Sequence, residues 1–285
     1  MNNMLIQAGV LWPMQRYFSR KTLEVNVFLF FICMAVLWPL REISISYQYP
    51  VTGFVLPHLL AYLYFQLGFF AAVIYFFSDI PFMNVWEMNR VMRMGRRKWI
   101  AGCIWTIVLH SYFLMVNVFL LTLVPLLGIT EWNKDWGKLL YTLSSMGDER
   151  LFFSISYRIL SGYTPGMAMV LCIGLGGAVI SVIGLIMFVI SLWINRMIAL
   201  AAATILTALP LMAENLSNLY NNLKIWYYSP ISWIRLDFIE WEYVRGLPGI
   251  DYIIPALFFI FIICCLLIFI KAKKVEFHWN HEETV

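Results

Sequence analysis

Six apolar runs without Asp, Glu, Lys or Arg follow one another along the sequence. They cover Val25–Leu40, Val51–Phe77, Trp99–Leu127, Met167–Trp193, Met197–Met212 and Tyr252–Ile270. A helix needs about 20 apolar residues to cross roughly 30 Å of hydrocarbon, so the shorter first and fifth runs must recruit flanking residues or let Lys and Arg snorkel. The runs are apolar on every face, whereas the strands of a membrane barrel alternate in polarity. The sequence therefore predicts an all-α polytopic membrane protein with six transmembrane helices.

The composition supports the same class, because 62% of the residues are apolar and only 13% are charged. Such a chain is far too apolar for a soluble globular protein. We expect residues 1–285 to form a single transmembrane domain, in which residues 1–24 lie at the interface and residues 271–285 form a cytoplasmic tail. The net charge of +4 is interpreted as a topology signal, so we expect lipids and no nucleic acid as partners.

A dense basic cluster orients the predicted spans. It lies between the second and third apolar runs and consists of Arg90, Arg93, Arg96, Arg97 and Lys98. Lys and Arg close to a span keep their loop in the cytoplasm. With this loop inside, six spans place both termini in the cytoplasm, and the internal segments then carry twelve of the 20 Lys and Arg residues.

Two cytoplasmic segments have the character of interfacial helices. Met4–Lys21 mixes apolar side chains with Arg16, Arg20 and Lys21. The second begins at Ser78-Asp79-Ile80-Pro81, where Ser or Asp can cap a helix and Pro is tolerated in the first turn. A helix over about Pro81–Met94 gathers one charged face, whose members are Trp86, Glu87, Arg90, Arg93 and Arg97. This face can dock a partner protein or bind lipid headgroups.

The external segments Gly128–Gly166 and Ala213–Asp251 are long and rich in aromatic residues, which suits pieces that lie at the membrane surface. The spans offer few polar side chains, and we take His58, Gln66, His110 and Asn117 as candidates to line a pathway. The sequence contains none of the motifs G-x-x-x-x-G-K-[ST], H-E-x-x-H, G-x-S-x-G or C-x-x-C. We therefore expect no catalytic residue, no metal site and no cofactor in this chain.

The pieces and their order resemble the permease subunits of ABC transporters, in the six-span type-2 exporter class. The resemblance runs over essentially the whole chain. It rests on F-S-D-I-P-F at Phe77–Phe82, R-V-M-R-M-G-R-R-K-W-I at Arg90–Ile100, a tight hairpin at Ile194–Arg196, Y-S-P-I-S-W-I at Tyr228–Ile234 and a basic end at Lys271–Lys274.

The resemblance implies a transport subunit that is not itself an enzyme. A separate ATPase would bind ATP and magnesium, and a second permease subunit, identical or related, would complete the pathway in the bacterial cytoplasmic membrane. By position, Leu5–Ser19 would be the connecting helix, Pro81–Met94 the coupling helix, and pieces between Ala213 and Gly249 the external re-entrant helices. The implied contacts with the ATPase are Phe82, Trp86, Glu87, Arg90, Arg93 and Arg97.

The apolar and Met-rich spans suit an amphipathic or hydrophobic cargo, such as a drug, an antimicrobial peptide or a lipid-like molecule. Two alternatives from other classes stay open. A secondary transporter would carry internal repeats and ionisable groups inside the membrane. A polytopic membrane enzyme would use His58 and His110.

Overall fold

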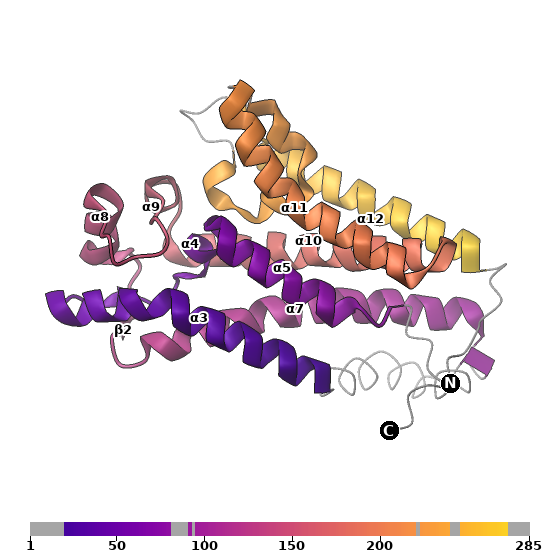
Figure 1. The fold of residues 1–285 in the computed structure, drawn as a ribbon, viewed down its shortest axis with the longest axis horizontal. Coiled ribbons are helices and arrows are strands. Elements are labelled where there is room, and N and C mark those ends of the chain that lie inside the picture. The colour runs from indigo at the N-terminus through magenta and orange to yellow at the C-terminus, as the bar shows by residue number, and fades with distance from the viewer. Residues whose placement is uncertain (1–19, 81–90, 93–94, 221–222, 240–245, 273–285) are drawn as a thin grey trace.

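The computed structural model describes residues 20–80, 91–92, 95–220, 223–239 and 246–272. Helices dominate this part of the chain (Figure 1). The α-helices are α3 (Arg20–Tyr47), α4 (Leu56–Ala61), α5 (Leu63–Phe77), α7 (Arg96–Leu126), α8 (Gly137–Met146), α9 (Tyr157–Gly162), α10 (Pro165–Trp193), α11 (Arg196–Tyr220) and α12 (Ile250–Ala272). Three short 3₁₀ helices lie between α11 and α12, namely η2 (Leu223–Tyr228), η3 (Pro230–Ile234) and η4 (Leu236–Phe238).

Five of these helices are long and apolar enough to cross a membrane: α3, α7, α10, α11 and α12. The chain is therefore a multi-pass membrane protein. The remaining apolar run does not form the continuous helix expected over Val51–Phe77. It is divided into the strand β1 (Val51–Thr52), α4 and α5, with a break at Tyr62, whose backbone is extended (φ −79°, ψ 114°).

The helix ends follow from local sequence. The side chain of Thr164 accepts a hydrogen bond from the backbone N–H of Met167, and Pro165 occupies the first turn, so α10 begins with a side-chain cap. Asn195 caps α11 in the same way, since its side-chain oxygen accepts from the N–H of Ile198 at 2.8 Å. Asn195 lies in the short turn between α10 and α11, so its cap starts the second helix of a tight hairpin.

α10 lies at the centre of the bundle. It contacts α7, α11 and α12, and also α4, α5 and η3, while α3 packs on α7 and α5 (Figure 1). Glycines allow a close approach between α10 and α7, because a Cβ added at Gly184 would lie 2.7 Å from Cγ2 of Ile107. Most of the apolar window of α10 is buried inside the protein, whereas only a minority of the corresponding windows of α11 and α12 is buried.

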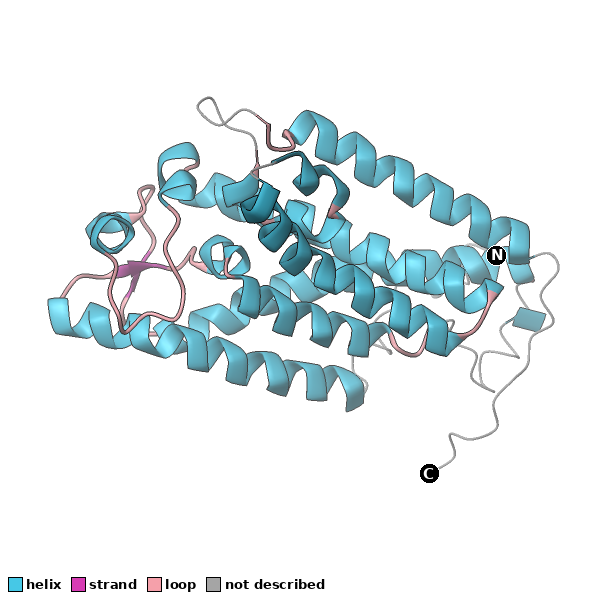
Figure 2. Cartoon of the chain, turned by 45° about the horizontal axis from the view of Figure 1, so that its top comes forward, coloured by secondary structure: helices cyan, strands magenta, loops and turns pink. Residues whose placement is uncertain are grey.

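The two ends of the bundle differ in structure. At one end, β1 pairs in parallel with β2 (Thr130–Glu131), and the short helices α8 and α9 lie beside this pair (Figure 2). At the other end, α3 begins, α5 ends, the α10–α11 hairpin turns and α12 ends. The described chain therefore enters and leaves the bundle at the same end.

Candidate functional site

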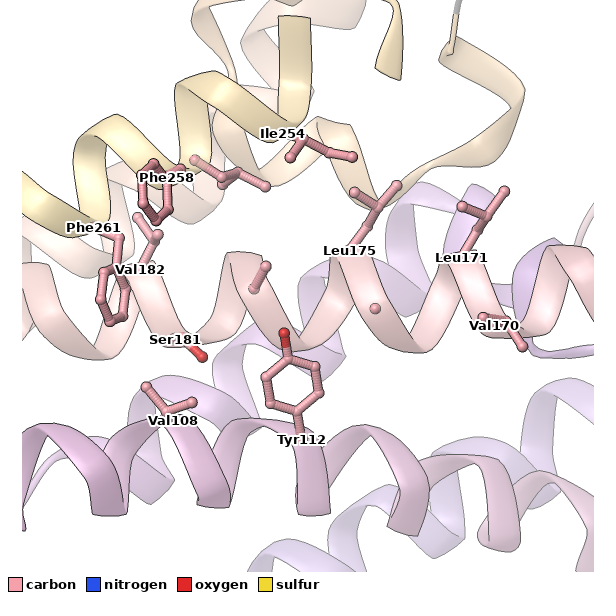
Figure 3. Close-up of a pocket in the computed structure, with 13 residues that line it drawn as sticks. Val108, Tyr112, Val170, Leu171, Leu175, Ser181, Val182, Ile254, Phe258 and Phe261 are labelled. Atoms are coloured by element: carbon pink, nitrogen blue, oxygen red, sulfur yellow. The ribbon is translucent and has the colours of Figure 1, made fainter. Parts of the chain in front are cut away.

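An apolar groove opens between α7, α10 and α12 (Figure 3). Its volume is about 520 Å³, and its lining contains no charged side chain. The side chains that shape it are Val108 and Tyr112 from α7, Leu175 and Ser181 from α10, and Phe258 and Phe261 from α12. It is open to the outside of the bundle, since Val170 and Phe258 on its rim are largely exposed. The groove lies among three helices that are long and apolar enough to cross a membrane.

Small residues of α10 keep the groove open. Gly174 lines the groove and is exposed, and an added Cβ there would have no heavy atom within 4 Å, so the groove is open at this position. At Gly177 an added Cβ would lie 2.4 Å from the ring of Tyr112, so only glycine lets that ring lie against α10. The hydroxyl of Ser181 donates to the Gly177 carbonyl at 2.7 Å. The Tyr112 hydroxyl has no hydrogen-bond partner among the residues that the structure describes.

The segment between α11 and α12 packs back onto the bundle. η3 contacts α10 and α11, and its residues Ile231 and Trp233 are buried. Gln66 of α5 donates its side-chain N–H to the Ile231 carbonyl at 3.0 Å, and Trp233 donates its ring N–H to the Trp226 carbonyl at 3.1 Å. Where the resemblance implied re-entrant helices, the structure has an α11 that continues to Tyr220, followed by short 3₁₀ helices.

A buried ion cluster holds this segment in place. Arg235 has a side chain only 7% exposed, and it pairs with Glu214 of α11 at 3.1 Å and with Asp237 at 3.2 Å. Its guanidinium also lies 4.2 Å from the ring centre of Phe238. Burial raises the pKa of the Asp237 carboxyl, and this effect outweighs the opposing charges of Arg235 and Arg158.

A second charged cluster, which we call the Asp79 junction, joins three parts of the chain at the opposite end. Asp79 lies two residues after the end of α5 at Phe77. Its carboxylate pairs with Lys21 in the first turn of α3 and, at 2.9 Å, with Arg196 in the first turn of α11. Lys21 also donates to Ser78 at 3.0 Å. The sequence suggested that Asp79 caps a following helix, and its pairing with Lys21 and Arg196 could not be inferred from local spacing.

His58 and Gln66 are buried beside the break between α4 and α5. The ring of His58 lies edge-on to Trp136 of the α8 region, with 5.0 Å between ring centres. Within the described part of the chain, neither ring nitrogen of His58 has a hydrogen-bond partner. The side-chain oxygen of Gln66 has none there either. Two buried polar groups with open hydrogen-bonding capacity therefore lie near the strand-bearing end of the bundle.

His110 and Asn117 lie elsewhere along α7. His110 is buried, with its ring 5.4 Å from that of Phe76 near the end of α5. Asn117 donates to the side-chain oxygen of Asn26 in α3 at 2.5 Å. None of the four residues expected along a pathway lines the groove. No sequence motif predicts the groove. The closely spaced glycines of α10 are the only local sequence feature that points to it.

The residues expected to contact an ATPase fall mostly outside the described part of the chain. This applies to Phe82, Trp86, Glu87, Arg90 and Arg93, to the connecting segment Leu5–Ser19 and to the tail. Arg97 is described, and it is exposed in the first turn of α7.

Comparison with known proteins gives no relative for this chain: no family model, no curated protein and no solved structure matches it. Among the described residues, no group of three or more His, Cys, Asp or Glu side chains is placed to hold a metal ion. The features that bear on function are therefore the groove, the Asp79 junction and the order of the segments that carry the resemblance.

Proposed function

We propose that this chain is the membrane-spanning permease subunit of an ATP-driven ABC exporter. It would form the translocation pathway and be driven by a separate ATPase subunit that binds ATP and magnesium. The proposal starts from the resemblance of the sequence to the six-span type-2 exporter class. The observation that carries it is the Asp79 junction, because it joins three parts of the chain immediately before the segment expected to contact the ATPase.

The geometry of the junction suits the transmission of movement. Residue 79 directly precedes the expected coupling segment Pro81–Met94, so a displacement of that segment acts on Asp79 first. The carboxylate of Asp79 is tied to α3 through Lys21 and to α11 through Arg196. The Ile80 carbonyl accepts a hydrogen bond from Ser191 near the end of α10 at 3.3 Å. A partner that moves this loop would therefore move the ends of α3, α5 and the α10–α11 hairpin together.

The exposed apolar faces suit a second permease subunit and the surrounding lipid. α12 contacts the bundle mainly through α10 and α7, and it exposes Phe259 and Leu266 outside the groove. Apolar surface of this kind is covered by lipid chains or by another membrane helix. A homodimer or heterodimer of permeases in the bacterial cytoplasmic membrane, with both termini in the cytoplasm, satisfies this requirement.

The positions of His58 and His110 do not support the two alternatives, a membrane enzyme and a secondary transporter. An enzyme that uses His58 and His110 together needs both rings at one site. His58 precedes α5, whereas His110 contacts Phe76 in the last turn of α5. At 1.5 Å per residue, the intervening length of α5 separates the two contacts by about 20 Å. The two histidines therefore do not form one catalytic pair, and the same separation counts against a short proton relay in a secondary transporter.

The test is a mild-detergent purification of the tagged chain from its native membrane, followed by mass spectrometry of what is retained. We expect an ATPase subunit in stoichiometric amount. Reproducible absence of an ATPase, with the chain itself intact and monodisperse, would overturn the proposal in favour of a self-contained carrier or membrane enzyme.

A second test concerns the coupling segment. The double variant Arg90→Glu, Arg93→Glu reverses two charges on the face expected to contact the ATPase. We expect it to insert normally but to lose retention of the ATPase or transport-stimulated ATP hydrolysis by at least tenfold. The matched control is Lys134→Glu, Lys138→Glu, which reverses two exposed charges at the opposite end of the bundle. Equal behaviour of the two double variants would count against the coupling assignment.

A further inference from the structure

We infer that the groove between α7, α10 and α12 is a binding site for one neutral, mainly apolar small molecule that carries a hydrogen-bond acceptor and enters sideways from the membrane. The role of this molecule as cargo rests on the proposed function, but its binding does not. The inference narrows the expected cargo from amphipathic or hydrophobic molecules in general to one chemical class.

The lining of the groove excludes charged ligands. It is formed by aliphatic and aromatic side chains, glycine, alanine and two hydroxyl groups, and no acidic or basic side chain contributes to it. An ion that moved into this groove from water would lose its hydration without gaining an opposite charge, which is strongly unfavourable. A neutral apolar molecule that is already dissolved in the bilayer meets no such barrier.

The two hydroxyl groups differ in what they can offer. Ser181 uses its hydroxyl within α10, on the Gly177 carbonyl. The Tyr112 hydroxyl has no partner in the described residues, and Figure 3 shows it directed from α7 toward α10, inside the groove. Its ring is fixed against Gly177, so the hydroxyl is held at a defined position. A carbonyl or ether oxygen on the ligand would accept a hydrogen bond from it.

The size of the groove selects a small molecule over a helix. Its volume of about 520 Å³ lies within the range of small-molecule pockets, roughly 300–1,000 Å³. The walls α7 and α12 also contact each other directly. A helix of about 10 Å diameter does not fit between walls that meet. The groove therefore suits neither a folded antimicrobial peptide nor a helix of a second copy of the chain.

The experiment uses tritiated benzophenone, a neutral aromatic ketone that forms covalent bonds to nearby C–H groups when irradiated. The purified full-length chain is placed in phosphatidylcholine nanodiscs, labelled over a range of concentrations, digested and mapped by mass spectrometry. We expect saturable labelling on α7, α10 and α12. Unlabelled benzophenone should compete well, diphenylmethane less well because it lacks the carbonyl, and 4-benzoylbenzoate poorly because it is charged.

Variants locate the site. Gly174→Leu places a bulky side chain in the open space beside Gly174, which lines the groove, and should lower saturable labelling at least tenfold, with Gly174→Ala intermediate. The matched control is Gly166→Leu in the first turn of α10, where an added Cβ also has no heavy atom within 4 Å but lies outside the groove. Tyr112→Phe should raise the half-saturating concentration of benzophenone about fivefold, the value of one typical hydrogen bond, and leave competition by diphenylmethane unchanged.

Two results would overturn the inference. Labelling that rises linearly with concentration and spreads over the exposed faces of α11 and α12 would show that lipid chains fill the groove. Saturable labelling that Gly174→Leu leaves unchanged would place the site elsewhere. The labelling experiment contains no ATPase, so saturable binding in the groove would support this inference even if no ATPase were retained with the chain from its native membrane. Retention of an ATPase without saturable binding in the groove would support the proposed function and overturn this inference.

Discussion

Replacing Gly184 with alanine tests the packing of α10 against α7. The added methyl group would lie 2.7 Å from Cγ2 of Ile107, and 3.5 and 3.6 Å from two ring carbons of Phe77. Carbon atoms that are not bonded pack at about 3.5–4.0 Å, so the methyl group must gain about 1 Å. Both neighbours are fully buried, and Ile107 is restricted to one main rotamer in a helix. The helices must therefore separate.

The expected magnitude comes from two opposing effects. Overpacking of a buried contact costs about 1–3 kcal/mol, whereas alanine stabilises a helix interior by about 0.8–1 kcal/mol relative to glycine. The comparison variant Gly174→Ala gains the same helix stabilisation but has open space around its new methyl group. The difference in stability between the two variants therefore isolates the packing cost, and Gly184→Ala should be the less stable by about 1–3 kcal/mol.

The buried free cysteines provide the assay. Cys33, Cys103 and Cys172 are inaccessible in the folded protein, so a thiol-reactive fluorophore reports their exposure during heating in detergent. At one heating rate, Gly184→Ala should unfold at a clearly lower temperature than Gly174→Ala, which should unfold at the wild-type temperature or above it. If Gly184→Ala proves as stable as Gly174→Ala, the close contact between α10 and α7 is wrong.

Three further predictions concern charged and titratable groups. Asp79→Asn should lower stability by about 1 kcal/mol, because two partly exposed ion pairs are lost, while Asp148→Asn, which breaks a pair within one loop, should have a smaller effect in the same thermal assay. Because burial raises the pKa of Asp237, the stability given by its neutral form is complete below the ordinary value of 3.8 and is lost as pH rises through the raised pKa. Asp237→Asn should remove this part of the pH dependence of the unfolding temperature. His58→Gln combined with His110→Gln should keep at least half of ATP-driven transport, and complete loss of activity with an intact fold would favour the enzyme alternative.

The positions of most crossing helices could be predicted because hydrocarbon demands long apolar runs. The short run Val25–Leu40 was expected to recruit flanking residues, and α3 does so by extending from Arg20 to Tyr47. How far the helix extends could not be predicted from the charge-free run alone. Its flanking charges are satisfied by distant partners: Lys21 pairs with Asp79, and Arg41 donates to the Pro125 carbonyl at 2.7 Å. A single-sequence pattern contains no information about such partners.

The break at Tyr62 and the groove depend on tertiary packing. Pro57 lies in the first turn of α4 and does not account for a break five residues later. Next to the break, Gln66 bonds to the Ile231 carbonyl, a contact over 165 residues. Gly177 and Gly184 of α10 allow close helix packing, because an added Cβ at either would collide with a side chain of α7. That Gly174 instead opens a groove follows only from the positions of α7 and α12.

The most direct test of the central claim is transport into inside-out vesicles prepared from native membranes with and without this chain. A fluorescent neutral aromatic ketone serves as the probe, and uptake is measured with ATP, with a non-hydrolysable ATP analogue and with a proton gradient alone. We expect uptake that requires both the chain and hydrolysable ATP. Uptake that depends on the chain but is driven by the proton gradient without ATP would contradict it.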